Sequence, residues 1–114
     1  MRMSVEQDGI IDIISTHRLT GEVTLTISDH LDWSDSIGHQ EILQRKLNRY
    51  LAFIESGEIV EQYPTAKDRA IAIKIVFQLA PDESAQAFLA QVKQIVEGAG
   101  FGFRTEIFRG AAFN

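Results

Sequence analysis

The chain contains no cysteine, and basic residues are in the minority. Without cysteine there is no disulfide, no thiolate metal site and no cysteine nucleophile, which suits a reducing compartment. Eleven Lys and Arg residues against sixteen Asp and Glu residues give a net charge of -5. Nucleic-acid binding depends on phosphate contacts by basic side chains, so this composition argues against a nucleic-acid partner.

Long apolar runs are also missing. No run approaches the roughly 20 residues that a helix needs to span a bilayer, and residues 1–8 are polar, without the apolar core of a secretory signal. We therefore expect a cytoplasmic protein with no membrane partner. The length of 114 residues and the hydrophobic content of 45% predict a single globular domain over residues 1–114. Residues 1–8 and 109–114 are expected to be loose ends.

Four short segments carry the pattern of β-strands. Val23, Leu25 and Ile27 alternate with polar residues, which is the period of a half-buried strand. A β-branched run precedes them, and the closeness of the two runs favours an antiparallel hairpin. The four predicted strands cover residues 10–14, 22–28, 70–78 and 101–108.

Two longer segments carry the helical period. Leu43, Leu47, Tyr50 and Ile54 fall on one stripe and predict a helix from about residue 35 to 56, which Gly57 ends. Asp32, Ser34 or Asp35 can cap its start. A second helix begins near Pro81, followed by acidic residues, and ends at the glycines after residue 97.

The predicted order of elements is ββαβαβ. Each strand has one apolar face and each helix has one core stripe, so two layers are enough to bury them. Right-handed crossovers place both helices on the same side of the sheet. We therefore predict an α+β two-layer sandwich, with a four-stranded mixed sheet and two helices on one face. The pattern leaves the strand order open.

Polar residues gather where the second strand ends and the long helix begins, in the segment Asp29-His30-Leu31-Asp32-Trp33. Ligands favour the carboxyl ends of such strands and the start of the next helix. The side chains expected around a site here are Asp29, His30, Asp32, Trp33, His39 and Tyr63. In the alternative interpretation these residues are structural. Asp29 or Asp32 caps the helix, His30 forms a hydrogen bond with a loop carbonyl, and Trp33 fills the end of the core.

The same segment raises two chemical hypotheses. His30, His39 and a carboxylate could hold a divalent metal, but their spacing matches no established ligand motif. A His beside an Asp is the minimum for general base catalysis, with Ser34 or Ser36 as nucleophile, yet no nucleophile elbow is present. We therefore assign no catalytic residue, no metal ligand and no cofactor, and expect a protein that is not an enzyme.

A second apolar line runs along the long helix. Ile42 and Phe53 are about three turns apart and lie outside the core stripe, with Lys46 and Arg49 close to their line. One interpretation is an exposed strip that binds a partner or a second copy of the chain. The other is that the connection over residues 58–69 folds back and covers it. The open face of the sheet carries no aromatic residue on its middle strands and is expected to be solvated.

The segments DHLDW at residues 29–33 and KLNRYLAFIESG at residues 46–57 resemble a family of uncharacterised bacterial proteins of similar length. The resemblance covers nearly the whole chain, is strongest over residues 27–64, and implies a small bacterial cytoplasmic protein. It carries over no catalytic residue.

These observations favour a non-enzymatic interaction module, with a homodimer as one form, that uses the Ile42–Phe53 side of the long helix or a sheet edge. The alternative is a small-molecule or metal site at the strand–helix junction. A third hypothesis, an acidic inhibitor of a basic partner, has only the charge and size of the chain to support it.

Overall fold

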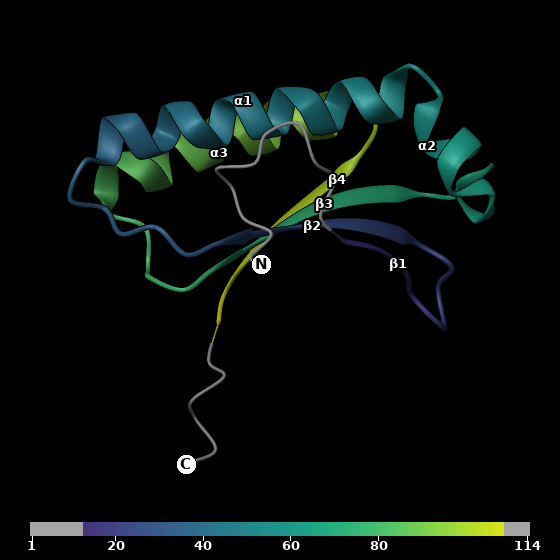
Figure 1. Ribbon diagram of the computed structural model, residues 1–114, viewed down its shortest axis with the longest axis horizontal. Coiled ribbons are helices and arrows are strands. Elements are labelled where there is room, and N and C mark those ends of the chain that lie inside the picture. Colours follow the sequence, from purple (N-terminus) through teal and green to yellow (C-terminus); the bar gives the residue numbers. More distant parts are fainter. Residues whose placement is uncertain (1–12, 109–114) are drawn as a thin grey trace, which may run out of the picture.

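The computed structural model describes residues 13–108 and confirms the predicted α+β order, with short helical turns added between the long helix and the third strand (Figure 1). Its elements are β1 (Ile13–Thr16), β2 (Val23–Asp29), α1 (Ser36–Glu55), α2 (Glu58–Gln62), the 3-10 turn η1 (Pro64–Ala66), β3 (Ile71–Phe77), α3 (Glu83–Gly98) and β4 (Gly102–Ile107). The start of the predicted first strand, residues 10–12, and both expected loose ends lie outside the described residues.

The strands form one sheet in the order β1-β2-β3-β4. The first two strands are antiparallel, and β2, β3 and β4 are parallel neighbours. Figure 1 shows α1 and α3 side by side on one face of this sheet. The carboxyl ends of β2 and β3 therefore meet at one end of the domain, where Asp29 is opposite Phe77.

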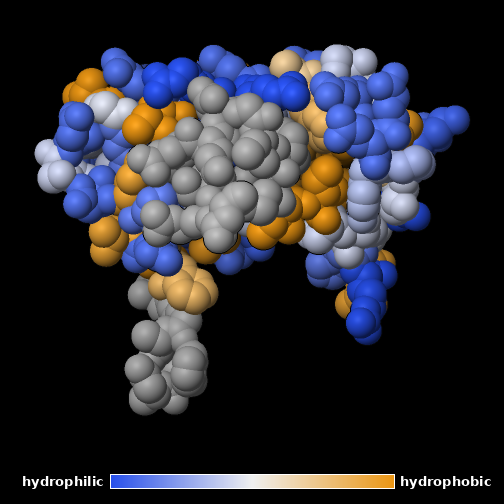
Figure 2. Space-filling model, in the orientation of Figure 1, coloured by the Kyte–Doolittle hydropathy of each residue, from blue (hydrophilic) through white to orange (hydrophobic). Residues whose placement is uncertain are grey.

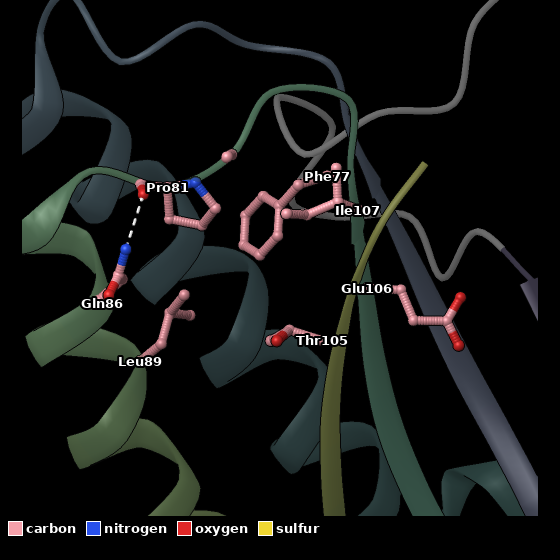
Figure 3. Close-up of a pocket in the computed structure, with 8 residues that line it drawn as sticks. Phe77, Pro81, Gln86, Leu89, Thr105, Glu106 and Ile107 are labelled. Atoms are coloured by element: carbon pink, nitrogen blue, oxygen red, sulfur yellow. Dashed lines mark hydrogen bonds between the residues drawn. The ribbon is translucent and has the colours of Figure 1, made fainter. Parts of the chain in front are cut away.

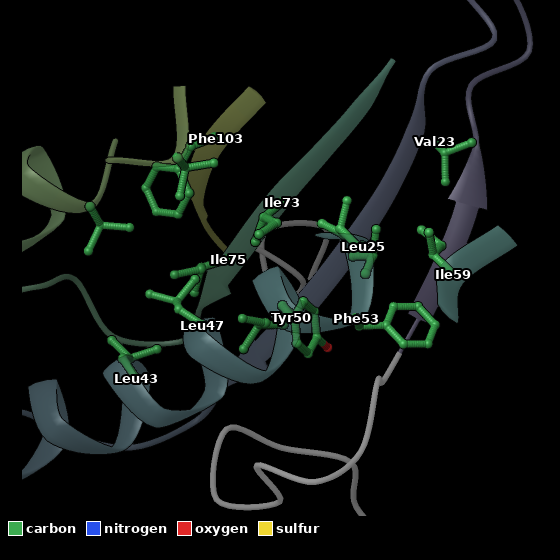
Figure 4. Close-up of a cluster of buried hydrophobic side chains, with 14 of the residues drawn as sticks. Val23, Leu25, Leu43, Leu47, Tyr50, Phe53, Ile59, Ile73, Ile75 and Phe103 are labelled. Carbon is green, nitrogen blue, oxygen red and sulfur yellow. The ribbon is translucent and has the colours of Figure 1, made fainter. Parts of the chain in front are cut away.

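The core lies between the sheet and the two long helices (Figure 4). Leu25 and Ile27 of β2 and Ile73 and Ile75 of β3 are completely buried. Each buried side chain of this size contributes about 1.5–3 kcal/mol relative to an exposed one. From α1, Tyr50 enters the same core and its hydroxyl donates a hydrogen bond to the carbonyl of Thr26 over 3.3 Å.

Local sequence sets the helix ends. The side chain of Asp35 accepts a hydrogen bond from the Gly38 amide over 3.1 Å, so Asp35 is the N-cap of α1. Asp82 caps α3 in the same way, accepting from the Ala85 amide over 2.8 Å. Gly57 follows α1 with φ of 85°, a left-handed conformation that glycine adopts without strain.

Of the two interpretations of the second apolar line along α1, the structure shows the covered one at Phe53, while Ile42 is half-buried. Phe53 is 1% exposed and Lys46 is completely buried, with its Nζ atom 5.5 Å from the centre of the Tyr50 ring. The reason is that the chain folds back after α1: Ile59 of α2 is buried in the same cluster, and Figure 4 shows it beside Phe53. Arg49 is half-buried and its guanidinium lies 3.6 Å from the carboxylate of Glu58.

The outer side of α1, at the top of Figure 2, carries mainly hydrophilic residues. Figure 2 also shows the turn between β1 and β2 as a hydrophilic projection at the lower right. Among the described residues, no helix combines the length and the apolar character needed to cross a membrane.

Candidate functional site

Asp29 and His39 form a buried pair at the junction of β2 and α1. Asp29 is the last residue of β2 and is 1% exposed; His39 lies in the first turns of α1 and is 3% exposed. The Nε2 atom of His39 is 2.6 Å from Oδ2 of Asp29. The second carboxylate oxygen accepts a hydrogen bond from the Leu31 amide over 3.0 Å. The pair therefore joins the sheet to the helix layer.

The hydrogen bonds of this pair fix its proton content. The Nδ1 atom of His39 is 3.0 Å from the carbonyl oxygen of Asp32. A carbonyl only accepts hydrogen bonds, so Nδ1 must carry a proton. The contact between Nε2 and Oδ2 then requires one further proton, held on either atom, and the pair is neutral in both forms. Burial raises the pKa of Asp29 above 3.8, against the opposing effect of the hydrogen bond from His39.

Trp33 covers the pair from one side. Its ring stacks on that of His39 with centroids 3.7 Å apart and planes inclined by 21°. Its indole N–H donates a hydrogen bond to the carbonyl of Leu79 over 3.1 Å. The centroid of its ring lies 5.8 Å from that of the Phe77 ring. The indole therefore links the loop after β3 to the start of α1 and shields the imidazole.

This geometry argues against the chemical hypotheses for the junction. Both ring nitrogens of His39 are hydrogen-bonded within the chain, so neither is available to a metal or a substrate. The described residues include no group of three or more metal-ligating side chains. The hydroxyl of Ser34 donates to Asp32 over 2.7 Å and that of Ser36 donates to Asp82 over 3.0 Å, as expected of residues that stabilise turns and helix starts.

An open cavity of about 420 Å³ lies beside the pair. It is lined by His30, Leu31, Asp32, Ser34, Asp35, Gly38, His39 and Ile42. Hydrogen bonds from the Ser34 hydroxyl and amide lower the pKa of Asp32 below 3.8, so this carboxylate is negatively charged at neutral pH. The structure thus brings three of the six predicted site residues, His30, Asp32 and His39, to one concave surface. Asp29 and Trp33 contact His39 but do not line this surface.

Tyr63 does not belong to this site. Its hydroxyl is 2.8 Å from the hydroxyl of Thr16, and Thr16 pairs with Val23 at the start of β2. Asp29 lies at the opposite end of that strand, about 20 Å away at 3.3 Å per residue. The prediction that Tyr63 forms a wall of the junction site was wrong, because α2 and η1 carry it to the other end of the sheet.

The sequence did not reveal a second concave surface, along β4. Two cavities, of about 680 and 470 Å³, share Gln86, Leu89, Thr105 and Glu106 and form one groove between α3 and the outer edge of the strand. Figure 3 shows Thr105 directed toward Leu89, while Glu106 points to the other side of β4. Ile107 lies beside Phe77 at one end of the groove. We name this surface the β4 groove.

The backbone of β4 faces the groove with unused hydrogen-bonding groups. The amide of Phe108 donates to the carbonyl of Phe77 over 2.6 Å, so residue 108 points toward β3. Backbone groups alternate in direction along a strand. The N–H and C=O groups of Phe103, Thr105 and Ile107 therefore point away from the sheet, and within residues 13–108 no further strand pairs with them.

The described structure is thus a small α+β domain with a parallel strand at a free edge of its sheet. A family model covers residues 3–109, and the chain belongs to this family, DUF6572, a family of unknown function. Comparison with curated proteins and comparison with solved structures each gave no match.

Proposed function

We propose that this domain is a non-enzymatic interaction module that binds an extended polypeptide segment along the β4 groove. The observation that carries the proposal is the row of outward backbone groups at Phe103, Thr105 and Ile107. In strand addition, such groups bind the backbone of the incoming segment, and pockets for alternate side chains add specificity.

The β4 groove has both parts of such a site. Residues of an added strand alternate in direction, so every second side chain enters the space between α3 and β4. The lining of that space includes the apolar side chains of Leu89 and Phe103 beside the polar Gln86 and Lys93. Native sheets usually protect their edges with charged side chains, Pro or a bulge. β4 carries Arg104 and Glu106, but it contains no Pro and pairs with β3 in unbroken register, and charges of both signs can pair with an incoming strand.

A matched pair of substitutions tests this function. Thr105→Pro removes an N–H that points outward, so it leaves the hydrogen bonds to β3 in place and blocks strand addition. Thr105→Val keeps the N–H and nearly the same shape. Peptides selected from a random library on the immobilised protein should shift the NMR signals of β4 and α3 amides in the Thr105→Val variant and in the unchanged protein. They should not bind the Thr105→Pro variant.

The control is that both variants keep a near-native unfolding midpoint. Selected peptides that shift only signals remote from β4, or that bind the proline variant with undiminished affinity, would show that the edge is not the binding surface. Failure to select any peptide that binds would count against the proposal as well.

A second candidate function is the binding of a small cationic molecule in the cavity at the junction. The ionised carboxylate of Asp32 on a concave surface of about 420 Å³ favours it. A panel of amine metabolites should then shift the amide signals of Ser34 and Gly38, which line the cavity, and Asp32→Asn should weaken the effect while leaving the fold intact. Unchanged amide signals around the cavity throughout the panel would dismiss this candidate.

A further inference from the structure

We infer that the segment bound in the β4 groove is the β4 strand of a second copy of this chain, antiparallel to the first. This inference rests on the proposed function and names its partner. It would join two four-stranded sheets into one continuous sheet, with a two-fold axis at Thr105.

The residues of β4 are complementary to themselves in one register. If Thr105 lies opposite Thr105 of the second copy, Arg104 lies opposite Glu106 and Phe103 lies opposite Ile107. Both members of each pair then point to the same face of the sheet. Opposite charges directly across a strand pair are stabilising, and so are aromatic residues opposite β-branched ones.

The neighbouring registers lack this complementarity. If the two-fold axis moves from Thr105 to Arg104, Arg104 lies opposite Arg104 of the second copy. If the axis moves to Glu106, Glu106 lies opposite Glu106 of the second copy. Like charges that face each other across a strand pair are destabilising, so charge favours Thr105 over Arg104 or Glu106 as the position of the axis.

The backbone agrees with the same register. In an antiparallel pair, residues opposite each other exchange two hydrogen bonds when both have their N–H and C=O groups directed at the partner strand. Phe103, Thr105 and Ile107 are the residues of β4 that point outward. The selected register therefore pairs each outward group with an outward group and leaves none of them unmatched.

The helix side of β4 has open space for a second strand. Cavities of about 680 and 470 Å³ lie between α3 and the outer edge of the strand. Ala90, a small residue, lines this groove together with Thr105.

A cysteine introduced at Thr105 tests the register directly. The chain has no cysteine, so a single substitution reports only contacts between copies. Cα atoms of a hydrogen-bonded antiparallel pair are about 5.5 Å apart, which is a distance that a disulfide spans. We expect Thr105→Cys to form a disulfide-linked dimer under mild oxidation. Ser15→Cys, an exposed position on the edge strand at the other side of the sheet, should remain unlinked.

Sedimentation of the full chain at micromolar concentration completes the test. We expect twice the chain mass of 12.8 kDa, and a return to the single mass in Thr105→Pro. Two results would overturn the inference: a single mass for the unchanged chain, or a dimer that resists Thr105→Pro and forms no disulfide in the Thr105→Cys variant. If selected peptides still bind at β4, such a result contradicts only the dimer and leaves the proposed function supported. If they do not bind, it contradicts both.

Discussion

The Oδ2 atom of Asp29 and the Nε2 atom of His39 lie 2.6 Å apart, although one residue ends a strand and the other belongs to a helix. The contact is buried, and the carbonyl of Asp32 fixes the proton on the far side of the imidazole. The pair therefore fixes the position of the start of α1 on the sheet. Its removal should lower the free energy of unfolding.

Two substitutions of Asp29 should differ in their cost. Asp29→Ala leaves the Nε2 atom of His39 and the Leu31 amide without their partner, and should lower the unfolding free energy by about 2–4 kcal/mol. Asp29→Asn keeps an oxygen for Leu31 and offers an N–H to Nε2, so its cost should be near 1 kcal/mol or less. Urea unfolding followed by the fluorescence of Trp33, the single tryptophan, measures both. Equal losses would show that the hydrogen bonds contribute little.

The raised pKa of Asp29 predicts a pH dependence with a definite sign. Above pH 3.8 the unfolded chain releases the proton of this carboxyl, while the folded chain retains it until the raised pKa is reached. The contribution of Asp29 to stability is therefore full below pH 3.8 and falls as the pH rises through the folded pKa. The difference in unfolding free energy between the unchanged protein and Asp29→Asn should decrease over this range. A difference that grows with pH would instead indicate an ionised carboxylate with a lowered pKa.

Two glycines at helix ends should respond in opposite directions to substitution by alanine. Gly57 has φ of 85°, where a Cβ atom causes strain although no atom lies within 4 Å of it, and Gly57→Ala should cost about 1 kcal/mol. Gly98 is the last residue of α3, lacks a positive φ and also has open space. Gly98→Ala should stabilise the protein by about 0.5–1 kcal/mol. Thermal unfolding of the two variants side by side checks the contrast, and a loss in both would refute it.

The periodic segments of this fold were predictable from the sequence. The stripe through Leu43 and Tyr50 predicted a helix over about residues 35–56, and α1 spans Ser36–Glu55. The alternation from Val23 to Ile27 predicted β2. By contrast, α2 has only five residues, which is too short for a helical period to appear, so the sequence does not decide whether Phe53 is covered.

The arrangement of the sites depends on contacts that no local pattern encodes. The cluster of polar residues located the junction, but the choice of His39 as the partner of Asp29 depends on the rotation of α1 over β2. The path of α2 and η1, which carries Tyr63 away from the junction, depends on tertiary packing. The alternation in Phe103, Thr105 and Ile107 was visible, yet the strand order decides that β4 lies at an edge.

Charge reversal at β4 distinguishes contacts between copies from contacts within one chain. Arg104→Glu places two acidic residues opposite each other in the inferred dimer, and Glu106→Arg places two basic ones. Each change should weaken dimerisation about tenfold, since two symmetric pairs at up to about 1 kcal/mol each are affected. The double variant Arg104→Glu/Glu106→Arg restores opposite charges across the interface, so dimerisation should recover.

The contacts within the chain supply the control for this experiment. Arg104 also pairs with Glu22 at 2.8 Å, and Glu106 with Lys74 at 3.6 Å. The double variant reverses both of these surface pairs into repulsions, each with an effect of about 0–1 kcal/mol. Its unfolding free energy, measured under conditions where the chain is monomeric, should therefore stay reduced while its dimerisation constant returns. If dimerisation instead follows the stability of the single chain, Arg104 and Glu106 do not face each other between copies, and the inferred register is wrong.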